Sequence, residues 1–300
     1  MLYNKFSDYL RLRYGKKIRK ICIDGGFSCP NRDGKCGTGG CIYCGERGSG
    51  EHLSPELSIA EQVRSSLKLQ EGRADGFLAY FQNFTNTYAP AEVLRTRYDA
   101  ALIDNRIVAL AIGTRPDCID KERAALIASY KDRLDVWVEL GLQTASDKTA
   151  MLINRGYDRA EFERAAAILK EYKIPIVVHT MIGLPGEGDG EIRELAEYLS
   201  RFDIFGIKIH SVYVMAGTVL EKMYNSGAYT PITLKEYTAR SAYLISHLNP
   251  EVVIHRLTGD CPKNLLVAPE WSADKSRVIR EIEGRLLAAG ERQGSHFQKG

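Results

Sequence analysis

Residues 20–44 read KICIDGGFSCPNRDGKCGTGGCIYC, a short apolar run that passes directly into a loop rich in glycine and cysteine. The loop holds four of the seven cysteines of the chain, which are Cys29, Cys36, Cys41 and Cys44. Closely spaced cysteines are poor core material but good thiolate ligands for a soft metal centre, and glycines let the backbone wrap closely around it. The sequence therefore predicts a strand that ends in a metal-binding loop.

Further apolar runs follow along the chain, and amphipathic stretches lie between most of them. We predict strands at 20–23, 76–81, 107–112, 136–140, 176–181, 207–212 and 252–255, and helices at 58–69, 91–99, 121–131, 159–172, 191–201 and 234–248. Repeated strand–helix units with short, β-branched strands indicate a parallel α/β sheet, either barrel-like or doubly wound. In a barrel the cysteine loop would lie at the carboxyl-terminal mouth of the strands, where such folds place their active sites.

The composition is that of an ordinary globular protein, with 300 residues of which 44% are hydrophobic and 26% charged. No apolar run approaches the roughly 20 residues of a membrane span, and the first residues lack the apolar stretch of a signal peptide. We therefore expect a cytoplasmic protein without membrane contact. In that compartment clustered cysteines bind metal or carry out redox chemistry more often than they form disulfides.

The predicted organisation is one catalytic domain, since no linker or low-complexity segment separates the predicted strands. We assign residues 1–17 to an N-terminal basic segment, 18–248 to the core barrel and 249–300 to a short C-terminal extension. The net charge of +3 gives no global signal for nucleic acid. Basic residues concentrated over 11–20 could contact phosphates, or could be the solvated face of a helix.

On spacing alone, two metal centres are compatible with the cysteine loop. Four cysteines could hold zinc tetrahedrally in a structural knuckle. Three could instead hold a [4Fe–4S] cluster and leave one iron open for a substrate or cofactor. Both motifs vary in their spacing, so the loop by itself does not separate the two readings.

Four later motifs favour the [4Fe–4S] cluster over the zinc knuckle, because together with the loop they resemble the radical S-adenosylmethionine (SAM) superfamily. They are ELGLQTA at 139–145, NRGY at 154–157, HTMIGLPGE at 179–187 and KIHSVYVMAGTVL at 208–220. The loop itself resembles the long-spaced cluster motif of the Elongator catalytic-subunit group, in which an aromatic residue such as Tyr43 typically precedes the last cysteine. Each motif alone is weak, but five in the right order are strong.

Within that superfamily the chain resembles the YhcC/YtqA-type family. The segments that carry this resemblance are CIDGGFSCPNRDG at 22–34, YFQNFTNTYAP at 80–90 and LTGDC at 257–261. The resemblance implies a partial (β/α)6 TIM-like barrel that cleaves SAM reductively at a [4Fe–4S] cluster and generates a 5′-deoxyadenosyl radical. Kinship with the Elongator subunit implies modification of tRNA wobble uridine at carbon 5. Its acetyltransferase domain has no counterpart here, so acetyl-CoA chemistry is not expected.

The resemblance also implies residue roles. It makes Cys29, Cys41 and Cys44 the cluster ligands, with Cys36 as the rival of Cys29, because the usual short spacing would require a cysteine where Gly37 stands. It implies SAM contacts at Tyr43, Gln82, Asn83, Glu139, Gln143, Arg155, Gly183 and Gly186. Glu139 ends an apolar strand, where a buried carboxylate is costly unless it is partnered. A salt bridge with Arg115 or Arg155 is the alternative to a SAM contact.

No catalytic residue can be assigned from the sequence, although Arg256, Asp260 and Cys261 are candidates for substrate contact. The expected partners are a tRNA substrate and a low-potential electron donor such as flavodoxin or ferredoxin. One alternative is a radical SAM enzyme that acts on a small molecule or a protein. A second alternative is a zinc-knuckle nucleic-acid-binding protein without SAM chemistry.

Overall fold

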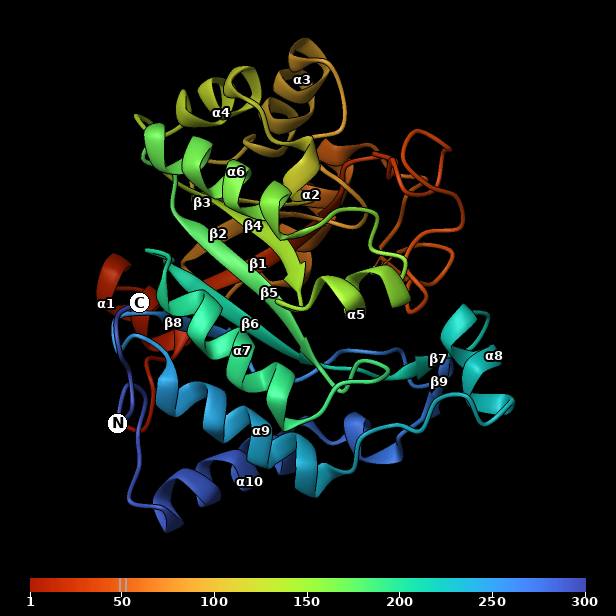
Figure 1. Ribbon diagram of the computed structural model, residues 1–300. Helices are drawn as coiled ribbons and strands as arrows, with labels where there is room; N and C mark the ends of the chain where they lie inside the picture. The colour runs from red at the N-terminus through yellow and green to blue at the C-terminus, as the bar shows by residue number, and fades with distance from the viewer. Residues whose placement is uncertain (49, 52) are drawn as a thin grey trace.

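Seven strands form one parallel sheet in the computed structural model, which describes residues 1–48, 50–51 and 53–300. In spatial order they are β1 (Ile18–Asp24), β2 (Gly76–Gln82), β3 (Ile107–Thr114), β4 (Asp135–Gln143), β5 (Ile176–Ile182), β6 (Gly206–Ser211) and β8 (Val253–Arg256). The sheet curls into a partial barrel whose edge strands, β1 and β8, are not paired with each other (Figure 1). The predicted fold class is confirmed, and β8 comes from the segment 249–300.

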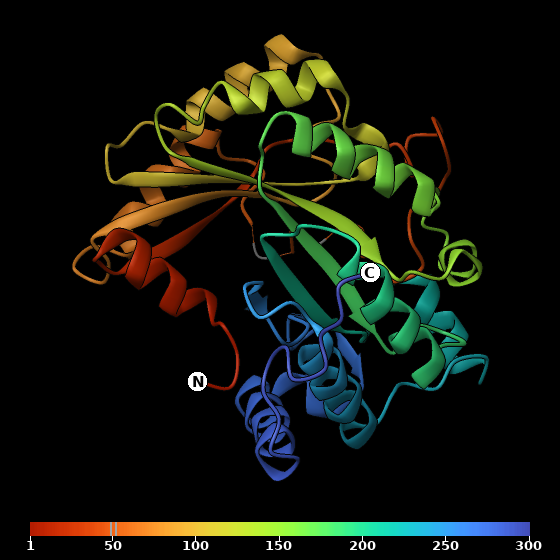
Figure 2. The same cartoon turned by 60° about the vertical axis from the view of Figure 1, so that its left-hand side comes forward.

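Helices cover the outer face of the curled sheet (Figure 2). They are α2 (Ile59–Leu69), α3 (Ala91–Ala101), α4 (Lys121–Ala128), α6 (Arg159–Glu171), α7 (Asp189–Ser200) and α9 (Leu234–His247), with α10 (Lys275–Ala288) packed on α9. Their starts follow local side-chain chemistry. Ser58 and Glu61 form a reciprocal capping box at α2, and Thr233 and Glu236 form another at α9.

The remaining elements are short and lie at the carboxyl ends of the strands or after β8. They are η1 (Pro116–Cys118), α5 (Asp147–Leu152), α8 (Val219–Asn225), η2 (Glu270–Ala273) and an antiparallel pair formed by β7 (Val214–Met215) and β9 (Leu266–Ala268). No helix among the described residues is long and apolar enough to cross a membrane.

Strand side chains alternate between two apolar layers, as the twofold period of a strand requires. Ile23, Phe81 and Leu110 face outward and belong to the main core beneath the helices. Leu78 and Trp137 face inward and form a second, smaller cluster inside the barrel. The inner apolar cluster therefore fills the lower part of the barrel interior. Polar side chains line the interior at the carboxyl ends of the strands.

The N-terminal helix α1 (Phe6–Tyr14) contacts both edge strands of the sheet and contributes to the inner cluster. The Phe6 ring stacks on His255 with 3.9 Å between ring centroids, and Arg13 forms a 2.8 Å ion pair with Asp135. This helix precedes the amino end of β1, whereas the cysteine loop follows its carboxyl end. The basic segment therefore lies at the opposite end of the barrel from the cysteine loop.

Candidate metal centre and cofactor site

A cavity of about 240 Å³ opens between the cysteine loop and the carboxyl ends of the strands. Most of the site residues expected from the sequence lie in its wall. These are Cys29, Cys41, Tyr43, Cys44, Gln82, Asn83, Glu139 and Gln143. The cavity brings together side chains that are separated by more than a hundred positions in the sequence. This is the arrangement expected for parallel strands whose carboxyl ends meet at one mouth.

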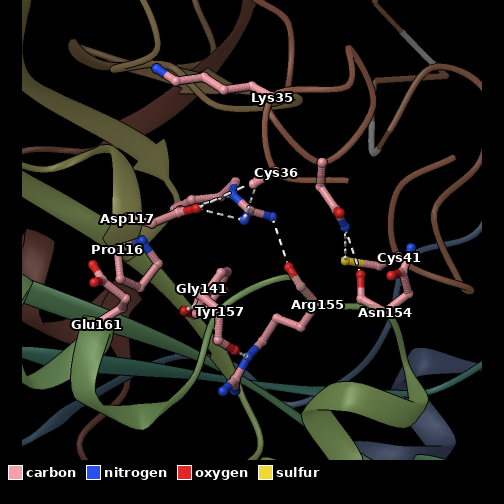
Figure 3. A network of polar contacts seen from close by, with 12 residues as sticks. Lys35, Cys36, Cys41, Pro116, Asp117, Gly141, Asn154, Arg155, Tyr157 and Glu161 are labelled. Carbon is pink, nitrogen blue, oxygen red and sulfur yellow. Dashed lines mark hydrogen bonds and ion pairs between the residues drawn. The ribbon is translucent and has the colours of Figure 1, made fainter. Parts of the chain in front are cut away.

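Cys36 is the one loop cysteine that does not line this cavity. It is exposed, and its Sγ lies 3.6 Å from Nη2 of Arg115 and 3.9 Å from Oδ2 of Asp117 (Figure 3). The fourth sulfur that a zinc knuckle would need is therefore placed on the outside of the loop. This geometry separates Cys36 from Cys29, which the sequence alone could not do.

Arg115 connects the cysteine loop to the rest of the site, and sequence reasoning considered it only as a partner for Glu139. Its guanidinium is buried, donates to both carboxylate oxygens of Asp117 at 2.9 and 2.7 Å, and donates to the carbonyl of Arg155 at 2.9 Å. It also lies over the ring of Tyr157, 4.7 Å from the centroid. Its position could have indicated a site residue, because Arg115 directly follows the carboxyl end of β3.

Gly37 has a steric role in the cysteine loop. A Cβ atom at position 37 would overlap the Oδ1 atom of Asn31. Asn31 is fully buried, donates from Nδ2 to the carbonyl of Asn154 at 2.6 Å, and places the same nitrogen 3.9 Å from Sγ of Cys41. A cysteine at position 37, as the short spacing requires, would displace this asparagine.

The backbone of the loop is held from two sides. The amide of Ile42 donates to the carbonyl of Ile153 at 3.1 Å, and the carbonyl of Ile42 accepts from the amide of Leu220 at 2.8 Å. On either side of Ile42, Cys41 and Cys44 share a hydrogen bond that lowers the pKa of the Cys41 thiol and raises the pKa of Cys44. The loop therefore offers a sulfur that gives up its proton readily, as a metal ligand must.

The donor set of the cavity suits an iron–sulfur cluster. A [4Fe–4S] cluster spreads its cysteine ligands over different irons. Cys29, Cys41 and Cys44 all line the same cavity, which suits that arrangement.

Unsatisfied polar atoms mark the cavity wall next to β2. Asn83 and Phe84 both have left-handed backbones, with φ of 82° and 51°, which is strained for residues other than glycine. Asn83 donates to Asp24 at 2.9 Å, but Oδ1 of Asn83 and Oγ1 of Thr85 are buried without a hydrogen-bond partner among the described residues. Buried polar atoms left this way cost about 1–3 kcal/mol each, so a bound ligand that reaches them is stabilised.

At the inner end of the cavity, the partner of Glu139 is neither Arg115 nor Arg155. Its Oε2 contacts Nζ of Lys208 and lies 2.6 Å from Nε2 of His179, while Oε1 accepts from Nε1 of Trp137 at 3.3 Å. Burial alone would raise the pKa of Glu139, but Lys208 and His179 hold this pKa well below its usual value. The carboxylate is therefore already charged and paired.

Gln143 lies where β4 ends, and its side chain faces the cavity. It also has a left-handed backbone, with φ of 59°. The hydroxyl of Tyr157 donates to the carbonyl of Gly141 at 2.8 Å and lies 3.1 Å from Oε1 of Gln143. These contacts fix the turn that carries the NRGY motif against the end of β4.

Three residues expected to contact SAM lie away from this cavity. Arg155 is fully buried, and its guanidinium donates to the carbonyls of Leu142, Thr144 and Tyr157. Gly183 and Gly186 form a left-handed turn after β5 that lines a different pocket, beside Ile232. The SAM contacts of these three residues stay predictions that the cavity does not support.

The three candidates for substrate contact follow one another at the end of β8. Nη2 of Arg256 lies 3.6 Å from Oδ2 of Asp260, which also contacts Lys275. Burial raises the pKa of the half-buried Cys261 thiol to about 11. None of the three lines the cavity directly.

Comparison with protein families defines the class of this protein. The model of the radical SAM superfamily matches residues 34–199, and the model of the Radical_SAM C-terminal domain matches residues 204–288. The chain belongs to the radical SAM superfamily, whose members use a [4Fe–4S] cluster and SAM. The superfamily match begins after Cys29, so it carries no information about the role of that cysteine.

Within the superfamily, the chain belongs to the family of protein YhcC. It is 39% identical to YhcC of Escherichia coli (strain K12) over 295 residues, which cover 98% of this chain and 95% of YhcC. A shorter similarity, 34% over 184 residues, relates 60% of this chain to 39% of the tRNA uridine(34) acetyltransferase of Dehalococcoides mccartyi. The predicted family, cofactors and partial kinship are confirmed.

A solved structure shows the same fold. Elp3 of the archaeon Methanocaldococcus infernus superposes with a TM-score of 0.72 at 19% sequence identity, covering 92% of this chain and 64% of that chain. At this identity the likeness concerns the fold alone.

Proposed function

We propose that this protein is a radical SAM enzyme that holds its cluster through Cys29, Cys41 and Cys44 and modifies tRNA at the wobble uridine. The observation that supports the radical SAM assignment and its three cluster ligands is the shared cavity. Its wall combines these three thiols with the unsatisfied Asn83 and Thr85 atoms, and it excludes Cys36.

When bound, the cluster supplies the electron for the reductive cleavage of SAM. The chain's own contribution is to bind and orient. Asn83 and Thr85 would hold the polar amino-acid end of SAM, since both present buried polar atoms beside the cysteines. Tyr43 and Gln143 would bound the same ligand from the loop and from β4. Asn31 and Arg115 would act as positioning residues for the loop.

The site is also built to limit access of water. Behind the cavity, Glu139 and Lys208 are only 1% and 2% exposed, and the apolar cluster around Trp137 closes the barrel below them. Reactive intermediates survive only where solvent is excluded, so a buried floor suits radical chemistry.

The tRNA half of the proposal is supported by the similarity to a tRNA uridine(34) acetyltransferase over 60% of this chain. The basic segment over 11–20 gives no support for a tRNA contact at the mouth, because it lies at the other end of the barrel. A low-potential electron donor, such as flavodoxin or ferredoxin, would complete the reaction. A small molecule or a protein remains the alternative substrate.

The test of the tRNA half is a comparison of modified nucleosides from a deletion strain and its parent by mass spectrometry. The proposal predicts a changed wobble-uridine derivative in the deletion strain, restored by the wild-type gene and not by a Cys41→Ala variant. Identical nucleoside profiles in all three strains would contradict tRNA as the substrate while leaving SAM cleavage untouched.

A further inference from the structure

The inner end of the cavity gathers ionisable side chains from four neighbouring strands. Tyr80, Glu139, His179 and His210 line the cavity, and Lys208 contacts both Tyr80 and Glu139. We call these five residues the inner chamber. The SAM contacts proposed above through Tyr43, Asn83, Thr85 and Gln143 do not use these five residues.

Positive charge exceeds negative charge around the inner chamber. Its one carboxylate, Glu139, forms an ion pair with Lys208 and lies 2.6 Å from Nε2 of His179. Two more cations approach from the edge strands: Lys20 lies over the Tyr80 ring, 4.6 Å from the centroid, and Arg256 is the register partner of Lys208 on β8.

Arg256 has little to neutralise it. Within the described residues its one ion-pair partner is Asp260 at 3.6 Å, which is about half exposed and shared with Lys275. The charge of Arg256 nevertheless acts on the inner chamber, where it lowers the pKa of both His179 and His210 after the larger effect of burial. The Arg256 side chain is about one third exposed and has one distant partner, so it is free to pair with a second anionic group.

The inner chamber also contains an unsatisfied polar atom. Nε2 of His210 is buried and has no hydrogen-bond partner in the described part of the chain. The rings of His179 and His210 lie 5.3 Å apart between centroids, and burial lowers the pKa of His210 well below its usual value, so the His210 imidazole is neutral at physiological pH. A neutral imidazole can donate one hydrogen bond to an acceptor placed in the chamber.

We propose that the inner chamber binds an anionic group of the substrate, a carboxylate or a phosphate, held by the free Nε2 of His210 and by Arg256, which lies beside the cavity wall on β8 as the register partner of Lys208. Lys208 and Lys20 add attraction at longer range. An anion in the chamber would give the unpartnered Nε2 of His210 an acceptor, and arginine is well suited to pair with carboxylate and phosphate oxygens. The inference deepens the proposed function, since it states a chemical property of the substrate that the same cavity would accept.

The chain offers its own reporter for this binding. Trp137 donates to Glu139 at the edge of the inner chamber, and the one other tryptophan, Trp271, donates instead to the carbonyl of Ile232. In a Trp271→Phe background, anaerobically purified protein is titrated with potassium acetate and separately with potassium phosphate, at ionic strength held constant with potassium chloride. We expect a saturable change in Trp137 emission that chloride does not reproduce. Saturation by acetate indicates a carboxylate, and saturation by phosphate indicates a phosphoryl group.

Variants of Arg256 and His210 test the assignment residue by residue. Arg256→Gln is expected to weaken anion binding about tenfold, the size of one lost charged hydrogen bond. His210→Phe should weaken it as well, and Arg256→Lys should restore part of the loss. The matched control is Arg277→Gln, which removes the same charge from an exposed i,i+4 pair on α10 and should change nothing.

Two results would overturn the proposal: no saturable response to either anion, or equal affinity in wild type and Arg256→Gln. Failure of the inference is distinguishable from failure of the proposed function. Production of 5′-deoxyadenosine from SAM is measured on the same preparations, and normal production without anion binding would refute the inner chamber assignment alone.

Discussion

The Sγ atom of Cys36 lies 3.6 Å from the guanidinium of Arg115, outside the cavity that the other three loop cysteines line. The side chain that pairs with Cys36 also holds Asp117 and the carbonyl of Arg155. The side chain of Cys36 is therefore engaged in contacts on the outside of the loop. This relationship distinguishes Cys36 from the three cysteines that we propose as cluster ligands.

Cys36→Ala is accordingly expected to keep its cluster, whereas Cys29→Ala should lose most of it. Iron and sulfide content and the visible absorption of anaerobically purified protein measure this directly. The reverse pattern, with Cys29→Ala intact and Cys36→Ala empty, would require the ligand trio to be reassigned.

Gly37→Ala should destabilise the protein, because the added Cβ would displace Asn31 from Asn154 and Cys41. Forcing a methyl group into a packed site costs about 1–3 kcal/mol of unfolding free energy. Urea denaturation measures the loss, and the same variant should retain less iron. Gly190→Ala is the control, since a Cβ there meets nothing within 4 Å and its effect should be near zero. Equal stabilities of the two variants would contradict the steric role of Gly37.

Arg115→Gln should loosen the loop, because it leaves Asp117 without its partner and removes a donor to the Arg155 carbonyl. Removal of one member of a largely buried pair costs about 3 kcal/mol or more. We expect a lower unfolding free energy and faster loss of iron to a chelator. Arg106→Gln breaks a similar two-point contact with Asp104 on the surface and is the matched control. Chelator kinetics that are the same in both variants would refute the positioning role of Arg115.

Lys208 should make stability depend on pH above neutrality. Burial lowers the pKa of Lys208 from 10.5 to about 7, even though Glu139 opposes the shift. Between these two pKa values the unfolded chain binds the proton that the folded chain has lost, so the contribution of Lys208 to stability rises with pH and is least favourable below pH 7. The facing groups are Tyr80, Glu139, His179, Arg256 and Lys20.

The comparison is between wild type and the double variant Lys208→Met/Glu139→Gln, which removes both charges together. From pH 7 to pH 9 the unfolding free energy of wild type should rise relative to the double variant, by at most about 1.4 kcal/mol per pH unit. Taking the difference removes the cysteine titrations common to both proteins. Parallel pH profiles would show that Lys208 keeps its proton throughout this range.

Much of the fold follows from the sequence because it rests on local patterns. Apolar runs such as 136–140 and 176–181 fall inside β4 and β5, and the cysteine loop follows β1 as predicted. The fold class, the cofactors and the family could be predicted from the order of short motifs. These signals are local or sequential, so they need no knowledge of which strands are neighbours.

The site contacts across strands could not be predicted in this way. The sequence indicated that Glu139 would need a partner and suggested Arg115 or Arg155, but the partners are Lys208 and His179. Those residues come together because β5 pairs with both β4 and β6 in a particular register. Arg155 fits a motif yet is buried among backbone carbonyls, a role set by the fold of its turn.

The most direct test of the account is the assay of SAM cleavage by anaerobically purified protein reduced with dithionite. We predict about four irons per chain, as a [4Fe–4S] cluster requires, and formation of 5′-deoxyadenosine and methionine in equal amounts. Cys41→Ala should lose both the irons and the products. A colourless protein that holds one zinc ion and leaves SAM intact would contradict the central claim.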